Sequence, residues 1–161
     1  MLHLGSPLPS SHACWAYAVV ASVEAAYGIA KNQSAPWLAV EALFALMGLS
    51  NSDKCSAGGS PTEAFEKLVA LDATSGLPGD SDPVGPTARG RGMVTRYPVQ
   101  AFERAQFKGY VGLVLAVQRQ PVVVHIEVSQ SFMQYDGVGR CNSHAISCPP
   151  CSVVPVLRVI T

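Results

Sequence analysis

Apolar residues recur at helical spacing in the first part of the chain. From Trp15 to Ala30, small and branched apolar residues return every three to four positions. Two prolines and two serines lie just before this run, and these residue types do not extend a helix backwards. The pattern therefore predicts a helix that begins beside Cys14 and fades within residues 28–32.

Two further helices are predicted before residue 72. Ser34 is a candidate cap for the second, with Pro36 in its first turn and Gly48 at its end. The third begins at residues 60–63, where Ser, Pro, Thr and Glu form a capping-box pattern with proline at the first helical position. Its apolar face continues as far as Leu71.

The second half of the chain is rich in candidate strands. Residues 76–92 contain many Gly, Pro, Asp and Ser, and they predict a long surface loop at a subdomain boundary. An apolar run at 110–118 predicts a short helix, whereas residues 97–106 fit neither pattern. Strands are predicted at 121–128, 144–146 and 153–160. We therefore expect one α+β domain, with a helical half at about 1–85 and a sheet half at about 86–161.

Composition narrows the class of protein. The chain has 161 residues, of which 48% are hydrophobic and 14% charged, which is enough for a single domain with a real core. Its 11 basic and 11 acidic residues cancel, and without a basic run we expect no nucleic-acid surface. No transmembrane span is predicted, because prolines and serines interrupt the uncharged first 23 residues. No signal peptide is predicted, because this stretch has no positive n-region and no clear cleavage site. Five cysteines leave at least one thiol unpaired in a monomer and do not fix the redox compartment.

Cys14 has two interpretations. At a helix N-terminus, free N–H groups and the helix dipole favour an anion, and the thiolate is the nucleophilic form of cysteine. Alternatively, Cys14 is a small buried hydrophobic residue, as most free cysteines are. This stretch alone leaves both interpretations open. Trp15 and Trp37 are predicted to lie in the core.

Several segments together resemble papain-like cysteine peptidases, the cathepsin family. Residues 13–17 (Ala-Cys-Trp-Ala-Tyr) resemble the nucleophile segment of that family, and residues 143–146 resemble the strand of its catalytic histidine. Residues 55–61 resemble its Cys-x-Gly-Gly-x-Pro loop with one extra residue, and two further family blocks are matched by 120–126 and 132–138. The resemblance implies a papain-like fold with a helical left half, an antiparallel-sheet right half and its last strands missing.

The resemblance also implies a reaction. Cys14 would attack a peptide carbonyl, and His144 would act as the acid and base. Gly58 and Gly59 would offer backbone hydrogen bonds to an extended peptide or protein substrate, because glycine allows close approach. The pocket for the substrate residue before the scissile bond would be bordered by Ser60, Pro61, His125 and Asn142. No cofactor or metal is implied, and the family works mostly in lysosomes, in vacuoles or outside the cell.

Three departures from the family pattern predict weak or no turnover. Leu8 stands where the family has a glutamine that donates to the oxyanion, and losing one such donor costs about 100- to 1000-fold in rate. Ser11 replaces the cysteine that would pair with Cys55. The chain stops at Thr161, about where the family has the asparagine that orients its histidine. The alternative is therefore an inactive pseudopeptidase that acts as a structural or binding subunit, with a partner chain covering the open sheet edge.

A zinc site is the second alternative. Four residues in the C-terminal segment have the spacing of a site with three thiolates and one imidazole, namely Cys141, His144, Cys148 and Cys151. Pro149 and Pro150 provide no N–H groups to support the thiolates, which disfavours zinc. The preferred interpretation of the segment from Cys148 to Cys151 is a turn stiffened by proline.

Overall fold

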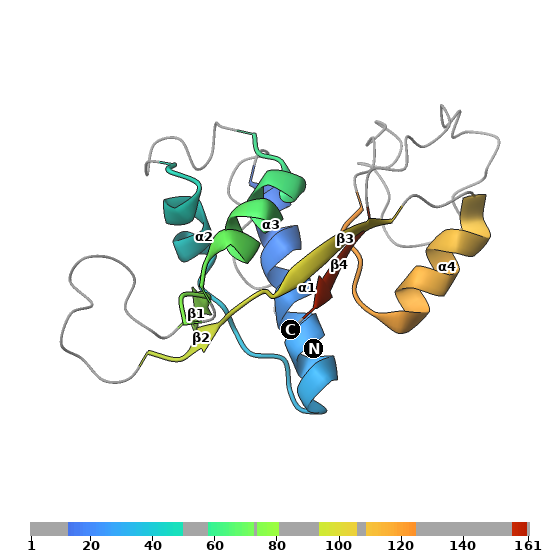
Figure 1. The fold of residues 1–161 in the computed structure, drawn as a ribbon, viewed down its shortest axis with the longest axis horizontal. Coiled ribbons are helices and arrows are strands. Elements are labelled where there is room, and N and C mark those ends of the chain that lie inside the picture. The colour runs from blue at the N-terminus through green and yellow to red at the C-terminus, as the bar shows by residue number, and fades with distance from the viewer. Residues whose placement is uncertain are drawn as a thin grey trace, which may run out of the picture.

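The computed structural model describes residues 13–49, 58–72, 74–80, 94–105, 109–124 and 156–160. Its elements are, in chain order, α1 (Cys14–Lys31), α2 (Val40–Leu46), α3 (Pro61–Ala70), β1 (Leu77–Pro78), β2 (Arg96–Tyr97), β3 (Ala101–Ala105), α4 (Gly109–Arg119) and β4 (Val156–Ile160). Figure 1 shows α1 at the centre, with α2 and α3 to one side and α4 to the other. The helices of the first half and the strands of the second confirm an α+β arrangement.

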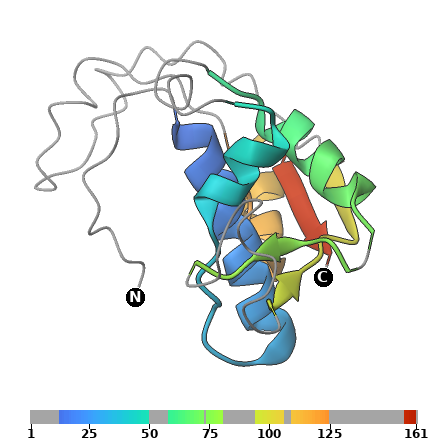
Figure 2. The same cartoon turned by 90° about the vertical axis from the view of Figure 1, so that its left-hand side faces the viewer.

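The core is built on one face of α1. Its buried apolar residues recur at helical spacing and form a continuous stripe, as predicted: Trp15, Ala16, Val19, Val20, Val23 and Ala26. Helices α2 and α3 both pack against α1, and Figure 2 shows them beside it from a second direction. They contribute Leu43, Phe44, Ala64, Phe65 and Leu68 to the same core cluster. This packing places the first turn of α1 close to the start of α3.

The predicted start of α2 is wrong. The helix begins at Val40 and not near Ser34, because the preceding residues make long-range backbone bonds that a helix would break. The Leu38 N–H donates to a carboxylate oxygen of Glu24 on α1 at 2.8 Å. Leu38 also pairs with Gly79 in an isolated β-bridge. These contacts hold the chain extended until Val40.

Two helix boundaries follow the sequence pattern more closely. Helix α2 ends with Met47 as its C-cap and Gly48 at φ 75°, a left-handed conformation that suits glycine. Helix α3 begins at Pro61, as predicted, with Ser60 as its N-cap. The predicted capping box is wrong in one respect, since Ser60 makes no side-chain cap hydrogen bond.

The predicted surface loop at residues 76–92 begins inside the fold. Gly76, Leu77 and Pro78 are buried, and β1 pairs antiparallel with β2. A Cβ on Gly76 would collide with the backbone of Tyr97, so this close approach requires glycine. Residues 81–92 of that loop lie outside the described residues.

The second half matches the predictions in part. Strand β3 pairs antiparallel with β4, with Ala101 opposite Ile160 and Ala105 opposite Val156. Helix α4 confirms the short helix expected at 110–118, and β4 confirms the end of the strand expected at 153–160. Residues 121–124 lie outside any strand, so the start of the strand predicted at 121–128 is wrong. The rest of that strand and the one at 144–146 lie outside the described residues.

Two further observations concern exposure. Trp37, predicted to lie in the core, is 59% exposed, because the residues before α2 run along the surface in an extended conformation. Among the described helices, none is both long and apolar enough to cross a membrane.

Candidate active site

Cys14 is the first residue of α1, and its side chain is exposed. The interpretation of Cys14 as a buried hydrophobic residue is therefore wrong. The preceding residue, Ala13, is buried and provides no side-chain cap. Its carbonyl accepts the N–H groups of Ala16 at 3.0 Å and Tyr17 at 3.4 Å. The N–H groups of Cys14 and Trp15 belong to the first turn and have no acceptor within the helix.

Trp15 directly follows Cys14 in the sequence, and its side chain lies in the core. Its side chain is 5% exposed and packs edge-on against Phe44, with ring centroids 5.9 Å apart and planes at 82°. The indole Nε1–H is buried and has no hydrogen-bond partner in the part of the chain that the structure describes. The orientation of the ring therefore comes from packing.

The 58–59 segment, which consists of Gly58 and Gly59, passes over this indole. A Cβ built on Gly59 would lie 2.6 Å from Cζ2 and 2.7 Å from Cδ2 of Trp15, and closer still to Cε2. A Cβ on Gly58 would meet no atom within 4 Å. Both glycines are exposed and lead directly into Ser60 and Pro61 at the start of α3. The structure thus brings Gly59, one of the two predicted substrate-binding glycines, against the residue that follows Cys14.

The sequence profile of the papain family cysteine protease matches residues 10–148, which is most of the chain. The chain belongs to the papain family. The matched region includes the N-terminus of α1 with Cys14 and the 58–59 segment. None of the curated protein sequences compared with the chain matches it.

A solved structure supports the same fold. The bromelain protease from Ananas comosus superposes with a TM-score of 0.56 at 23% sequence identity. The match covers 76% of this chain and 55% of bromelain, so the chain spans little more than half the length of that relative. Together with the family match, this likeness confirms the papain-like α+β fold expected from the sequence.

Part of the predicted papain-family site lies outside the described residues. This applies to His144, His125 and Asn142, to Leu8 and Ser11, and to all the cysteines other than Cys14. The four residues of the zinc alternative, Cys141, His144, Cys148 and Cys151, likewise lie outside the described residues. Within the described ranges, no three His, Cys, Asp or Glu side chains gather closely enough to hold a metal ion. Of the predicted site, the structure describes the N-terminus of α1 with Cys14 and the 58–59 segment beside Trp15.

Two polar side chains of α1 were not singled out by sequence reasoning. Glu24 is half-buried, and burial raises the pKa of its carboxyl, with the charge of Asp80 adding to the rise and the Leu38 N–H opposing it. The Tyr27 hydroxyl donates to the carbonyl of Pro98 at 2.5 Å, and burial raises the pKa of this phenol. The sequence signal that could have identified them is a polar residue within an otherwise apolar helical stripe. Both residues tie α1 to later parts of the chain.

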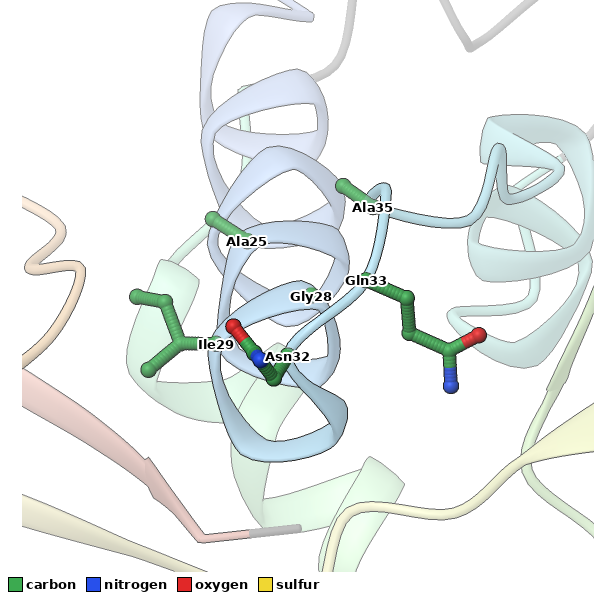
Figure 3. Close-up of a pocket in the computed structure, with 6 residues that line it drawn as sticks. All are labelled: Ala25, Gly28, Ile29, Asn32, Gln33 and Ala35. Carbon is green, nitrogen blue, oxygen red and sulfur yellow. The ribbon is translucent and has the colours of Figure 1, made fainter.

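A shallow groove lies at the other end of α1. It is lined by Ala25, Gly28, Ile29, Asn32, Gln33 and Ala35. Figure 3 shows the side chains of Ile29 and Gln33 directed to opposite sides of the helix end, so they do not converge on a common point. The groove begins at Ala25, about 17 Å from Cys14 at 1.5 Å per helical residue, and is separate from the papain-family site.

Proposed function

We propose that this chain is a cysteine peptidase domain in which Cys14 is the nucleophile and His144 the acid–base group. The observation that carries the proposal is the exposed Cys14 at the first position of α1, in a chain of the papain family. Free N–H groups in the first turn of a helix stabilise negative charge, so this position suits a reactive thiolate.

In the proposed reaction, His144 accepts the thiol proton of Cys14 while the sulfur bonds to the carbonyl carbon of a peptide. The tetrahedral intermediate collapses as the C–N bond breaks, and His144 passes the proton to the leaving amine. Water then attacks the thioester, which releases a carboxylic acid and restores the thiol. No cofactor or metal takes part in these steps.

Substrate binding would use the backbone of the 58–59 segment, which can pair with an extended peptide as an added strand. Exposed glycines suit this role because no side chain blocks the approach. The pocket for the substrate residue before the scissile bond would be bordered by Ser60, Pro61, His125 and Asn142.

We propose slow turnover. Leu8 occupies the place of the glutamine that serves papain-like peptidases as an oxyanion donor, and leucine has no donor. The backbone N–H of Cys14, which has no acceptor within α1, would remain as one donor. Loss of the other donor lowers the rate by about 100- to 1000-fold.

The test compares two thiol reagents on the whole chain, with modified sites identified by peptide mass spectrometry. Iodoacetamide reports thiol reactivity alone, and a peptidyl epoxysuccinate also requires a peptide-binding wall. We expect selective, pH-dependent labelling of Cys14 over the other four cysteines, loss of that label in Cys14→Ala, and slower labelling in His144→Ala. Equal labelling of all five cysteines in a folded sample would overturn the proposal.

A second candidate function is peptide binding without turnover, and Leu8 is the observation that favours it. The two candidates differ in one measurement, which is hydrolysis of a fluorogenic peptide by protein whose Cys14 accepts the peptidyl reagent. Hydrolysis that is lost in Cys14→Ala supports the peptidase. Full labelling of Cys14 with no hydrolysis supports the binding protein. In the peptidase case, Leu8→Gln should raise the rate of hydrolysis, since it restores the missing oxyanion donor.

A further inference from the structure

Gly58 and Gly59 are adjacent in sequence, but their surroundings differ. A methyl group on Gly58 would meet open space, whereas one on Gly59 would overlap the indole of Trp15. Neither glycine has the left-handed φ that would by itself require glycine. Close approach to the indole is therefore the reason for glycine at position 59.

The indole has little freedom to move away. It is buried, its ring packs edge-on against Phe44, and the atoms nearest Gly59 belong to the rigid fused ring. Its unpartnered Nε1 is bonded to Cε2, the ring atom nearest Gly59. With no hydrogen bond among the described residues to orient it, the ring depends on the shape of its pocket, which the 58–59 segment helps to form.

Trp15 also has a fixed relation to the thiol. Cys14 and Trp15 are consecutive residues in the first turn of α1, so the backbone of one helix sets the position of both. One residue faces solvent and the other faces the core. The surface on which Gly59 rests therefore moves with Cys14 as one body.

We infer that Trp15 is a positioning residue whose buried indole holds the 58–59 segment at a fixed place beside Cys14, and thereby determines how well the site binds a peptide backbone. This inference rests on the proposed function and deepens it. In this inference Trp15 does not contact the peptide substrate at the scissile bond, and it acts through its contact with Gly59. Removal of the Trp15 indole should impair recognition of a peptide and leave the intrinsic reactivity of the Cys14 thiol unchanged.

The experiment is a double-mutant cycle on the whole chain with Gly59→Ala and Trp15→Leu. The measured quantity is the second-order rate of Cys14 modification by a peptidyl epoxysuccinate, divided by the rate with iodoacetamide. We expect either single substitution to lower this ratio about tenfold, the equivalent of 1.4 kcal/mol, and the pair to lower it little further. The effects are not additive because both changes break the same contact.

Gly58→Ala is the matched control, since it adds the same methyl group one residue earlier. This methyl contacts no part of Trp15, so the effect of Gly58→Ala on the ratio, whatever its size, should be the same with and without Trp15→Leu. Circular dichroism and thermal unfolding identify variants that fail to fold. A non-perturbing readout covers that case, because Trp37→Phe leaves Trp15 as the only tryptophan. Its emission should then shift when the peptidyl reagent occupies the site.

The outcomes separate the two proposals. If wild-type Cys14 shows no preference for the peptidyl reagent, the proposed function fails and the inference fails with it. If the wild type prefers the peptidyl reagent but Gly59→Ala and Trp15→Leu lower the rate ratio additively, only the inference is overturned. The same holds if Trp15 emission does not change when the reagent is bound. Coupling between positions 15 and 59, without coupling between 15 and 58, supports it.

Discussion

The two ends of α1 are built in different ways. At the C-terminal end, polar groups have partners: the Gln33 N–H donates to the carbonyl of Gly28 at 3.1 Å, and Asn32 adopts the left-handed conformation that closes a helix. One turn earlier, Glu24 and Tyr27 hold distant segments by hydrogen bonds. This end is fastened to the rest of the fold through polar contacts.

At the N-terminal end, fewer polar groups have partners among the described residues. No side chain caps the helix, the Cys14 thiol faces solvent, and the indole N–H of Trp15 has no partner among the described residues. Among the described residues, apolar packing of Trp15 and Ala16 in the core holds this end in place. If the proposed function holds, unoccupied N–H groups at this end would serve charge that develops on the substrate, while the polar contacts at the other end stabilise the fold.

The largest expected effect comes from breaking the core that both ends share. Phe65 of α3 is 0% exposed and stacks on Phe102, with ring centroids 5.7 Å apart. We expect Phe65→Ala to lower the free energy of unfolding by about 3–5 kcal/mol, measured by urea denaturation, because it leaves a cavity beside α1. Both ends of α1 should unfold in the same transition in this variant.

Glu63→Ala on the exposed face of the same helix is the control and should change stability by less than about 0.5 kcal/mol. A loss for Phe65→Ala no larger than that of the control would mean that α1 does not depend on α3.

A change confined to the fastened end should have a smaller effect. Glu24→Ala removes the acceptor of the buried Leu38 N–H, so we expect a loss of about 1–3 kcal/mol in urea denaturation. Iodoacetamide should label Cys14 at an unchanged rate in the folded variant, because Glu24 lies nearly three turns away. Glu24→Gln keeps an acceptor oxygen and should retain most of the stability. An altered labelling rate would show that the two ends are coupled.

The same contrast explains what the sequence could predict. The place of Cys14 at the start of α1 followed from local signals, since an apolar helical stripe begins immediately after it. Proline at the first position of α3 and glycine after α2 likewise predicted helix ends from residue type alone. These features depend on neighbours in the chain, and such local patterns therefore predicted the start of three of the four described helices to within two residues.

Long-range contacts account for the failures. The start of α2 was misplaced because the Leu38 N–H bonds to Glu24 on another helix, which no local pattern reveals. Trp37 was predicted to be buried from its residue type, although the extended segment carries it to the surface. The contact between Trp15 and Gly59 was equally hidden, since a Gly-Gly pair does not show which of its two residues meets a ring.

A single hydrogen bond at the fastened end gives a smaller effect. Tyr27→Phe deletes the bond to the Pro98 carbonyl and keeps the ring, which packs edge-on against Tyr97. We expect a loss of about 0.5–1.5 kcal/mol in the free energy of unfolding. Tyr17→Phe on the exposed side of α1 is the matched control and should have almost no effect. Equal losses for the two variants would argue that the Pro98 bond contributes nothing.

The smallest expected effect is a pH dependence at Glu24. Burial raises the pKa of this carboxyl in the folded protein above its value in the unfolded chain, and the charge of Asp80 adds to the rise. The unfolded chain therefore releases this proton more readily. The contribution of Glu24 to stability is complete below its unfolded pKa and is lost as the pH rises through its folded pKa.

Glu24→Gln removes this titration and keeps the acceptor for Leu38. We expect the thermal midpoint of the variant to rise relative to that of the wild type between pH 4 and pH 7. The gain should correspond to less than about 1 kcal/mol, because the Glu24 side chain is only partly buried. Asp80→Asn in the wild-type background should reduce the pH dependence, since it removes the charge that helps to raise the Glu24 pKa. A difference between variant and wild type that is constant with pH would mean that the Leu38 bond cancels the effect of burial on the Glu24 pKa, and Glu24 would then be a purely structural acceptor.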